Sequence, residues 1–143
     1  MPANTAPIFS LLPEIASDGG TAQSVSITVA TNTYDGVSTD GKLVFTAGAN
    51  GSYIKKLRIK SLGTNTVAAL RIFLNNGATR ATATNNKFYG EVSLPAVTAS
   101  STSGTVDIDY VMDIALPPAW AIYACVSAGI TAGWTVCAVA GDY

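Results

Sequence analysis

The 143-residue chain contains no histidine. Histidine is the usual general base, the usual partner of a nucleophilic serine or cysteine, and the commonest zinc ligand. Its absence disfavours the hydrolases and the zinc proteins that depend on an imidazole. We therefore expect a protein that is not an enzyme and that holds no metal ion and no cofactor.

Charged residues are also scarce. They make up 12% of the chain, against about 25% in an average soluble domain. Hydrophobic residues make up 48%, and the mean hydropathy is +0.33. Apolar runs such as Ala119–Val126 are far shorter than the roughly 20 residues of a membrane-spanning helix. We expect no membrane contact, and a surface that is largely covered by other subunits.

The first 20 residues, MPANTAPIFSLLPEIASDGG, contain no lysine or arginine, and Pro7 and Pro13 interrupt their apolar residues. A secretory signal begins with basic residues and continues with an unbroken apolar stretch, so we expect no targeting segment. The apolar residues of this stretch also lack helical spacing. We predict an extended arm over residues 1–20, lying on its own domain or on a neighbour, and one domain over residues 21–143.

Eight segments of this domain alternate apolar and polar residues with period two, which is typical of strands with one face on a core. These segments are Ser24–Asn32, Lys42–Ala47, two strands within Tyr53–Gly77, Lys87–Leu94, Thr105–Ile114, Trp120–Ser127 and Gly133–Ala140. In Lys87–Leu94 the alternation places Phe88 on the core side of the strand. Asn-Gly and Asp-Gly pairs, which favour tight turns, fall between several of the segments. The pattern predicts an all-β, antiparallel two-sheet sandwich of about eight strands. A jelly roll is the first choice and an immunoglobulin-like sandwich the second.

The charges are segregated along the chain. All eight basic residues lie between positions 41 and 90, and all nine acidic residues lie outside this stretch. Five basic residues belong to Tyr53–Gly77, which we predict to be a hairpin.

Three explanations are open for this basic hairpin. Its side chains pair within the fold with the strand that carries Asp107, Asp109 and Asp113; or basic and acidic faces meet between copies or on a larger partner; or the basic face binds nucleic acid. The sequence pI of about 5.1 argues against the third, and we expect no nucleic-acid partner.

Cys125 and Cys137 flank the sequence SAGITAG. If the segments on either side form an antiparallel hairpin, the two cysteines lie within reach of a disulfide. The other interpretation is a pair of small buried thiols.

Two ligand interpretations compete with plainer ones. Asp107 and Asp109 project from one face of a strand and could hold calcium, although solvated strand charges explain them as well. A sugar-stacking platform could be formed by the aromatic residues Tyr34, Trp120, Tyr123 and Trp134, although Trp134 also fits the core.

Three stretches, Phe45–Gly77 (FTAGANGSYIKKLRIKSLGTNTVAALRIFLNNG), Glu91–Ala96 (EVSLPA) and Ala132–Tyr143 (AGWTVCAVAGDY), resemble short structural proteins of tailed bacteriophages and prophages. The resemblance covers nearly the whole chain, including the arm, and its motifs are turn and strand signatures. Small all-β proteins of this kind are often head decoration, or cement, proteins. The resemblance implies a homotrimer, made in the cytoplasm of the host bacterium, that binds the virion's outer capsid surface and braces the major capsid protein.

Such docking would be multivalent, with modest contacts from each copy acting together. We expect the contacts to come from the arm residues Ile8, Phe9, Leu11 and Leu12 and from the basic-face residues Lys55, Lys56, Arg58 and Lys60. The alternative function is a glycan-binding or a fibre- or tail-associated β-sandwich module of the virion.

Overall fold

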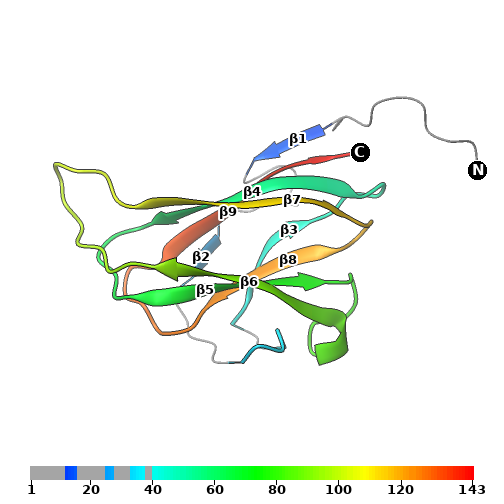
Figure 1. Ribbon diagram of the computed structural model, residues 1–143, viewed down its shortest axis with the longest axis horizontal. Helices are drawn as coiled ribbons and strands as arrows, with labels where there is room; N and C mark the ends of the chain where they lie inside the picture. Colours follow the sequence, from blue (N-terminus) through cyan, green and yellow to red (C-terminus); the bar gives the residue numbers. More distant parts are fainter. Residues whose placement is uncertain (1–11, 16–24, 28–32, 38–39) are drawn as a thin grey trace, which may run out of the picture.

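The computed structural model describes residues 12–15, 25–27, 33–37 and 40–143 (Figure 1). Its elements are β1 (Leu12–Ile15), β2 (Val25–Ile27), β3 (Lys42–Thr46), β4 (Ser52–Ser61), β5 (Ala68–Asn75), the 3-10 helix η1 (Ala83–Asn85), β6 (Asn86–Leu94), β7 (Asp107–Leu116), β8 (Ala121–Val126) and β9 (Trp134–Asp142). Each of the eight predicted strands is represented, and the described residues contain no α-helix. The all-β class is confirmed.

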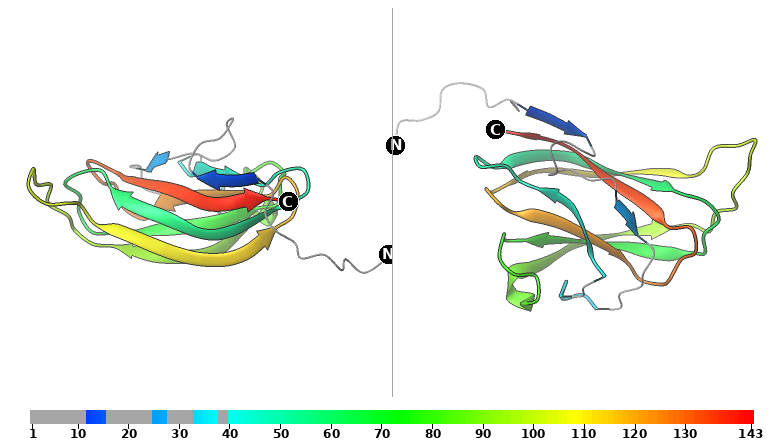
Figure 2. Two further views of the ribbon diagram at one scale, coloured as in Figure 1. Left: turned by 90° about the horizontal axis from the view of Figure 1, so that it is seen from above. Right: turned by 180° about the vertical axis from the view of Figure 1, so that it is seen from behind.

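The strands form two antiparallel sheets that face each other (Figures 1 and 2). Sheet A has the order β9-β4-β7, and both β1 and β2 pair with the outer edge of β9. Sheet B has the order β3-β8-β5-β6. The predicted two-sheet antiparallel arrangement is therefore confirmed.

The pairing follows one simple rule. β2 pairs with β9, β3 with β8, β4 with β7 and β5 with β6. The chain from β2 to β9 is thus one long hairpin, folded so that its successive strand pairs alternate between sheet A and sheet B.

The predicted hairpin over Tyr53–Gly77 is wrong, because β4 and β5 lie in different sheets. β4 pairs with β7 and β9, whereas β5 pairs with β6 and β8. Between them, Asn65 is buried and its backbone pairs with that of Val97. The connection therefore crosses the end of the sandwich and does not turn back along β4.

The hairpin that would have brought the two cysteines together is wrong for the same reason. Cys125 of β8 lies opposite Arg71 in sheet B, and Cys137 of β9 lies opposite Arg58 in sheet A. No disulfide joins them. Cys125 is buried and Cys137 is half-buried, where burial raises the pKa of the Cys137 thiol.

Part of the predicted arm is a strand of the sandwich. In β1, Leu12 lies opposite Asp142 and Ile15 lies opposite Val139, both in β9. Of the two placements left open for the arm, these residues adopt the one on their own domain. Ile8, Phe9 and Leu11 lie outside the described residues.

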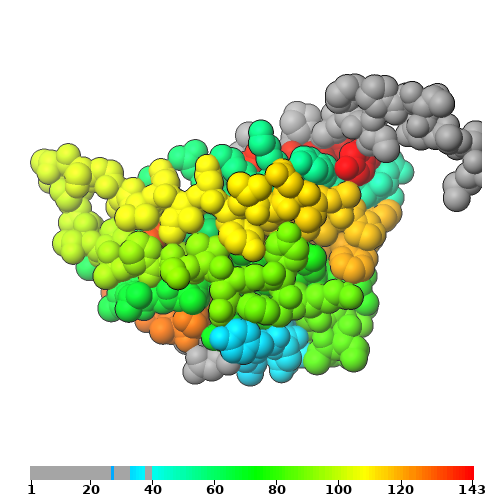
Figure 3. Space-filling view, viewed as in Figure 1, coloured from blue at the N-terminus to red at the C-terminus, as the bar shows by residue number. Residues whose placement is uncertain are grey.

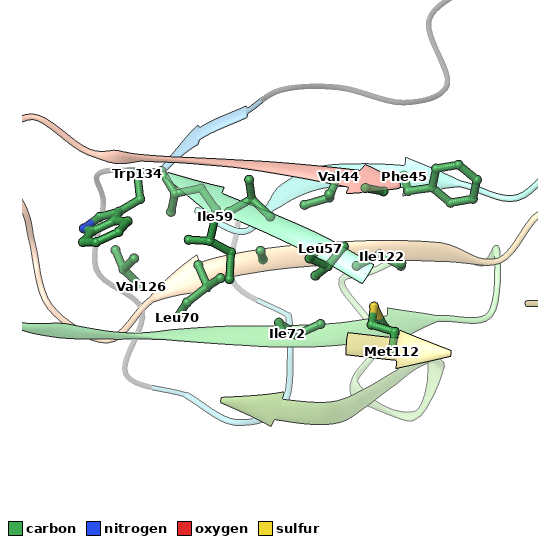
Figure 4. Close-up of a cluster of buried hydrophobic side chains, with 14 of the residues drawn as sticks. Val44, Phe45, Leu57, Ile59, Leu70, Ile72, Met112, Ile122, Val126 and Trp134 are labelled. Atoms are coloured by element: carbon green, nitrogen blue, oxygen red, sulfur yellow. The ribbon is translucent and has the colours of Figure 1, made fainter. Parts of the chain in front are cut away.

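The hydrophobic core fills the space between the sheets, where side chains from both point toward one another (Figure 4). Leu57 and Ile59 of sheet A and Leu70 and Ile72 of sheet B are fully buried, as is Trp134. Burying one aliphatic side chain of this size contributes about 1.5–3 kcal/mol relative to exposure. These alternating positions were readable from the sequence.

The two sheets differ on their outer faces. In β4 buried and exposed side chains alternate, whereas β5 is buried continuously from Leu70 to Phe73. The reason is a covering segment, residues 33–37, on the outside of sheet B. Its Gly36 has φ +72°, and a Cβ there would lie 2.9 Å from the Phe73 ring. β5 of sheet B is therefore covered on both faces, while sheet A presents the outer face of β4 and β7 to solvent.

Candidate interaction surface

The outer face of sheet A carries a ladder of opposite charges. Lys56 Nζ lies 2.6 Å from Asp109 Oδ2, Arg58 Nη2 lies 3.2 Å from Asp107 Oδ2, and Lys60 Nζ lies 3.2 Å from Asp107 Oδ1. We call these five residues the charge ladder. A basic stripe on β4 thus runs beside an acidic stripe on β7.

The alternation in β4 and β7 places these side chains on one face of sheet A, and a β-bulge shifts the inward–outward alternation of β4 by one residue. The β4–β7 register shifts between Ile54 and Lys56, and opposite this shift Asp113 has φ +46°. As a result Ile54 and Leu57 are both fully buried although they are three residues apart. Lys56, like the exposed Tyr53 beyond the bulge, therefore faces solvent.

The ladder is exposed, so its electrostatic effects are modest. The hydrogen bond from Lys60, followed by that from Arg58, lowers the pKa of the Asp107 carboxyl. Tyr53 extends the ladder, because its hydroxyl donates to Asp113 Oδ1 at 2.8 Å, and this bond raises the pKa of Tyr53. Exposed pairs of this kind fix strand register and orientation more than they add stability.

The first of the three explanations is therefore confirmed for Lys56, Arg58 and Lys60, which pair within the fold with the acidic strand. Arg71, another basic residue of Tyr53–Gly77, pairs with Glu91 of β6. Of the four predicted basic contact residues, Lys56, Arg58 and Lys60 belong to the charge ladder. Lys55 lies at the bulge, is exposed, and has no ion-pair partner among the described residues.

The calcium interpretation has no support from this geometry, because Asp107 and Asp109 are held by the cations of β4. Within the described ranges, no group of three or more histidine, cysteine, aspartate or glutamate residues is placed to hold a metal ion.

The four aromatic residues considered for a sugar-stacking platform do not come together on one exposed surface. Trp134 is fully buried in the core. Trp120 is half-buried, and so is Tyr123, over which the Arg80 guanidinium lies 4.7 Å from the ring centroid. Tyr34 alone of the four is well exposed, at 54%.

A second polar cluster lies on the outer face of sheet B. Arg71 Nε donates to Glu91 Oε1 at 2.8 Å, and Arg71 Nη2 donates to the Tyr34 hydroxyl at 2.9 Å. The guanidinium carbon lies 3.9 Å from the centroid of the Tyr34 ring, and the Tyr34 ring contacts Phe88 edge to face at 5.1 Å. We call Tyr34, Arg71, Phe88 and Glu91 the Tyr34 cluster.

Burial and pairing oppose each other at Arg71, whose side chain is only 8% exposed. Burial lowers the pKa of Arg71, but the hydrogen bonds and charges of Glu91 and Tyr34 outweigh it, and the net shift is upward. Arg71 thus stays charged beneath the covering segment, and holds Tyr34 in place.

The sequence did not indicate the Tyr34 cluster. Phe88 was expected to face the core, but the β5–β6 register shifts between Ile72 and Phe73, which leaves Tyr89 as an extra residue. Phe88 consequently faces outward and is 42% exposed. The opposite charges of Arg71 and Glu91 were the available signal, but only the strand pairing shows that they lie opposite each other.

Comparison of the chain with protein-family models, with curated proteins and with solved structures finds no match. In the part of the chain that the structure describes, no helix has the length and apolar character needed to span a membrane.

Proposed function

We propose that the protein is a non-enzymatic structural protein of a phage virion, a decoration protein that binds the outer surface of the head and stabilises the major capsid protein lattice. The observation that carries the proposal is the strand order, β2-β9-β4-β7 in one sheet and β3-β8-β5-β6 in the other. This order supports a jelly roll, an architecture found in viral capsid proteins and lectins.

The same strand order counts against the immunoglobulin-like alternative. In that sandwich the first two strands of the domain pair within one sheet, whereas β2 and β3 lie in different sheets. Since one fold serves many functions, the step from a jelly roll to head decoration rests on the resemblance of the sequence to phage structural proteins.

The charge ladder is the proposed docking face. It lies on the solvent-facing side of sheet A, with a positive stripe beside a negative one. A capsid surface with the opposite pair of stripes would accept it in one orientation and repel it in the reverse one. Lys55, which is exposed at the bulge and has no ion-pair partner within the described ranges, adds a positive charge next to Lys56.

The arm is the second proposed contact. β1 begins at Leu12, opposite Asp142 and so beside the C-terminus. Residues 1–11 contain no charged side chain but include Ile8, Phe9 and Leu11. Fully extended, a segment of this length spans at most about 36–40 Å, enough to reach a neighbouring subunit. Several such contacts in a homotrimer would act with a much greater combined affinity.

Binding to heads that lack the protein tests this proposal. The full chain should bind at a fixed copy number per head and raise the temperature at which the heads rupture. A variant lacking residues 1–11 keeps β1, and should bind at least about tenfold more weakly because one of several linked contacts is lost. Equal binding by this variant would refute the arm contact, and no binding by the full chain would refute decoration.

A further inference from the structure

Two exposed aromatic rings meet on the outer face of sheet B. Tyr34 is 54% exposed and Phe88 is 42% exposed, with ring centroids 5.1 Å apart and planes at 87°. In the space-filling view the cyan segment that contains Tyr34 lies on the surface next to the green residues of β6 (Figure 3). Phe88 rests in turn on the buried Phe73, at 5.6 Å between centroids. Phe88 thus offers an apolar surface supported from below by Phe73, with the Tyr34 ring nearly perpendicular beside it.

A hydrogen-bond donor and an acceptor stand beside this surface. Nε and Nη2 lie on the same edge of the planar guanidinium of Arg71, and they hold Glu91 Oε1 and the Tyr34 oxygen side by side. The phenol oxygen accepts from Arg71, so its own proton can be donated to a ligand. The carboxylate of Glu91, whose side chain is 37% exposed, can accept.

From this geometry we propose that the Tyr34 cluster binds a neutral pyranose sugar. A pyranose has an apolar face of C–H groups, which packs on aromatic rings, and neighbouring hydroxyls that both donate and accept. One hydroxyl would accept from Tyr34 while the next donates to Glu91. The stacking surface is the exposed part of the Phe88 ring, and the Tyr34 ring stands nearly perpendicular beside it.

The charges around the cluster select against acidic sugars. Arg71 is already neutralised by Glu91, and Asp35, which is exposed, follows directly after Tyr34 and accepts from the Val37 amide at 3.1 Å. Two carboxylates would repel a uronate or a sialic acid.

This site does not depend on the proposed head contact. The outer faces of sheets A and B point in opposite directions, so a copy docked through the charge ladder would hold the Tyr34 cluster away from the head. Sugar binding and head binding are therefore separately measurable on the same variants.

The competing explanation is structural: Tyr34 and Arg71 merely fasten residues 33–37 to sheet B. The two explanations differ for substitutions that leave this fastening intact. Phe88→Leu keeps an apolar side chain over Phe73 but removes the aromatic face. Tyr34→Phe keeps the ring but removes the hydroxyl. Tyr53→Ala is a control, since Tyr53 is likewise an exposed tyrosine whose hydroxyl is hydrogen-bonded, in its case to Asp113.

The test is a titration of the full chain with the neutral probes cellohexaose, maltohexaose and chitohexaose and with the acidic probe hexagalacturonate. Binding is measured from the changes in the NMR chemical shifts of the backbone amides. We expect at least one neutral probe to bind with a Kd at or below about 1 mM. Phe88→Leu should weaken it about tenfold, Tyr34→Phe about three- to tenfold, and Tyr53→Ala less than about twofold. Each variant is first checked for an unchanged amide spectrum outside the site.

Three results would overturn the proposal. They are the failure of all neutral probes to bind at about 1 mM, binding that survives Phe88→Leu unchanged, and binding of hexagalacturonate as tight as that of the neutral probes.

Discussion

Lys60 of β4 lies directly opposite Asp107 of β7, and its Nζ is 3.2 Å from both oxygens of that carboxylate. Together with Arg58, it holds the pKa of Asp107 below the ordinary value of 3.8. A carboxyl whose pKa is lower in the folded chain adds stability above its ordinary pKa and loses it as the pH falls through the folded value. The charge ladder is therefore an acid-sensitive feature of sheet A.

The first prediction follows from the lowered pKa of Asp107. Asp107→Asn should be less stable than the wild type at about pH 6, and the difference should be smaller at about pH 2, because the wild-type carboxyl loses its charge as the pH falls through its lowered pKa. Urea unfolding at the two pH values measures the difference. In about 1 M salt the difference at the higher pH should shrink, because exposed charges are screened. A stability difference that persists unchanged at the lower pH would show that Asp107 acts through something other than its charge.

The second prediction separates internal pairing from docking. Inverting the whole ladder, with Lys56, Arg58 and Lys60 changed to glutamate and Asp107 and Asp109 changed to lysine, preserves every internal pair but reverses the stripes. We expect a change of only a few degrees in Tm and a loss of head binding of at least about tenfold. Normal binding by the inverted variant would exclude the ladder as the docking face.

A control for this inversion changes only Lys56 and Arg58 to glutamate. It breaks the internal pairs and the docking pattern together, so it should lose both stability and binding. If it lost Tm but bound heads normally, the ladder would serve folding alone.

The third prediction concerns the ion pair beneath the covering segment. Glu91→Ala leaves the Arg71 guanidinium, only 8% exposed, without its carboxylate. We expect a cost of about 1–3 kcal/mol in the free energy of unfolding. Asp109→Ala, which removes an exposed partner of Lys56, should cost less than about 1 kcal/mol. Equal costs for the two variants, measured by denaturant unfolding, would contradict this ranking of the two pairs.

The fourth prediction concerns a buried amide at one end of the sandwich. Asn65 is 4% exposed; its Nδ2 donates to Ser61 Oγ and to the carbonyl oxygen of Gly133, and its Oδ1 accepts from the amides of Ala132 and Gly133. Asn65→Ala should cost about 1–3 kcal/mol for each buried group left unpaired. It should also increase hydrogen exchange at Gly133.

Thr66→Ala, an exposed change next to Asn65, is the control for this variant. A cost no larger than that of the control would mean that water replaces the Asn65 amide without penalty.

The strands could be predicted from the sequence because their signal is local. Alternation such as that of Leu57 and Ile59 around Arg58 identifies a strand with one buried face, whichever sheet it joins. The all-β class and the core followed from such patterns. Trp134 was correctly placed in the core by its plainer interpretation.

What the sequence did not reveal depends on pairing between distant residues. The alternation of β4 and β5 is the same whether they form a hairpin or lie in opposite sheets, so the hairpin was wrongly expected. Of the two interpretations of the cysteines, the pair of free thiols is the one that the structure shows. The outward turn of Phe88 depends on a bulge, and Arg71 is buried only because residues 33–37 cross over sheet B. Neither the bulge nor the crossing produces a periodic pattern in the sequence. Pairing within the fold, as between Lys60 and Asp107, was one of three explanations left open by the sequence. The register of β4 against β7 shows that this pairing forms.

The central claim is tested most directly by an electron cryo-microscopy reconstruction of the phage particle that carries this protein. The account predicts sandwich-sized density on the outside of the head, three copies to a cluster, in fixed ratio to the major capsid protein, with β4 and β7 toward the shell. Density confined to the tail or fibres, or a bare head surface, would contradict it.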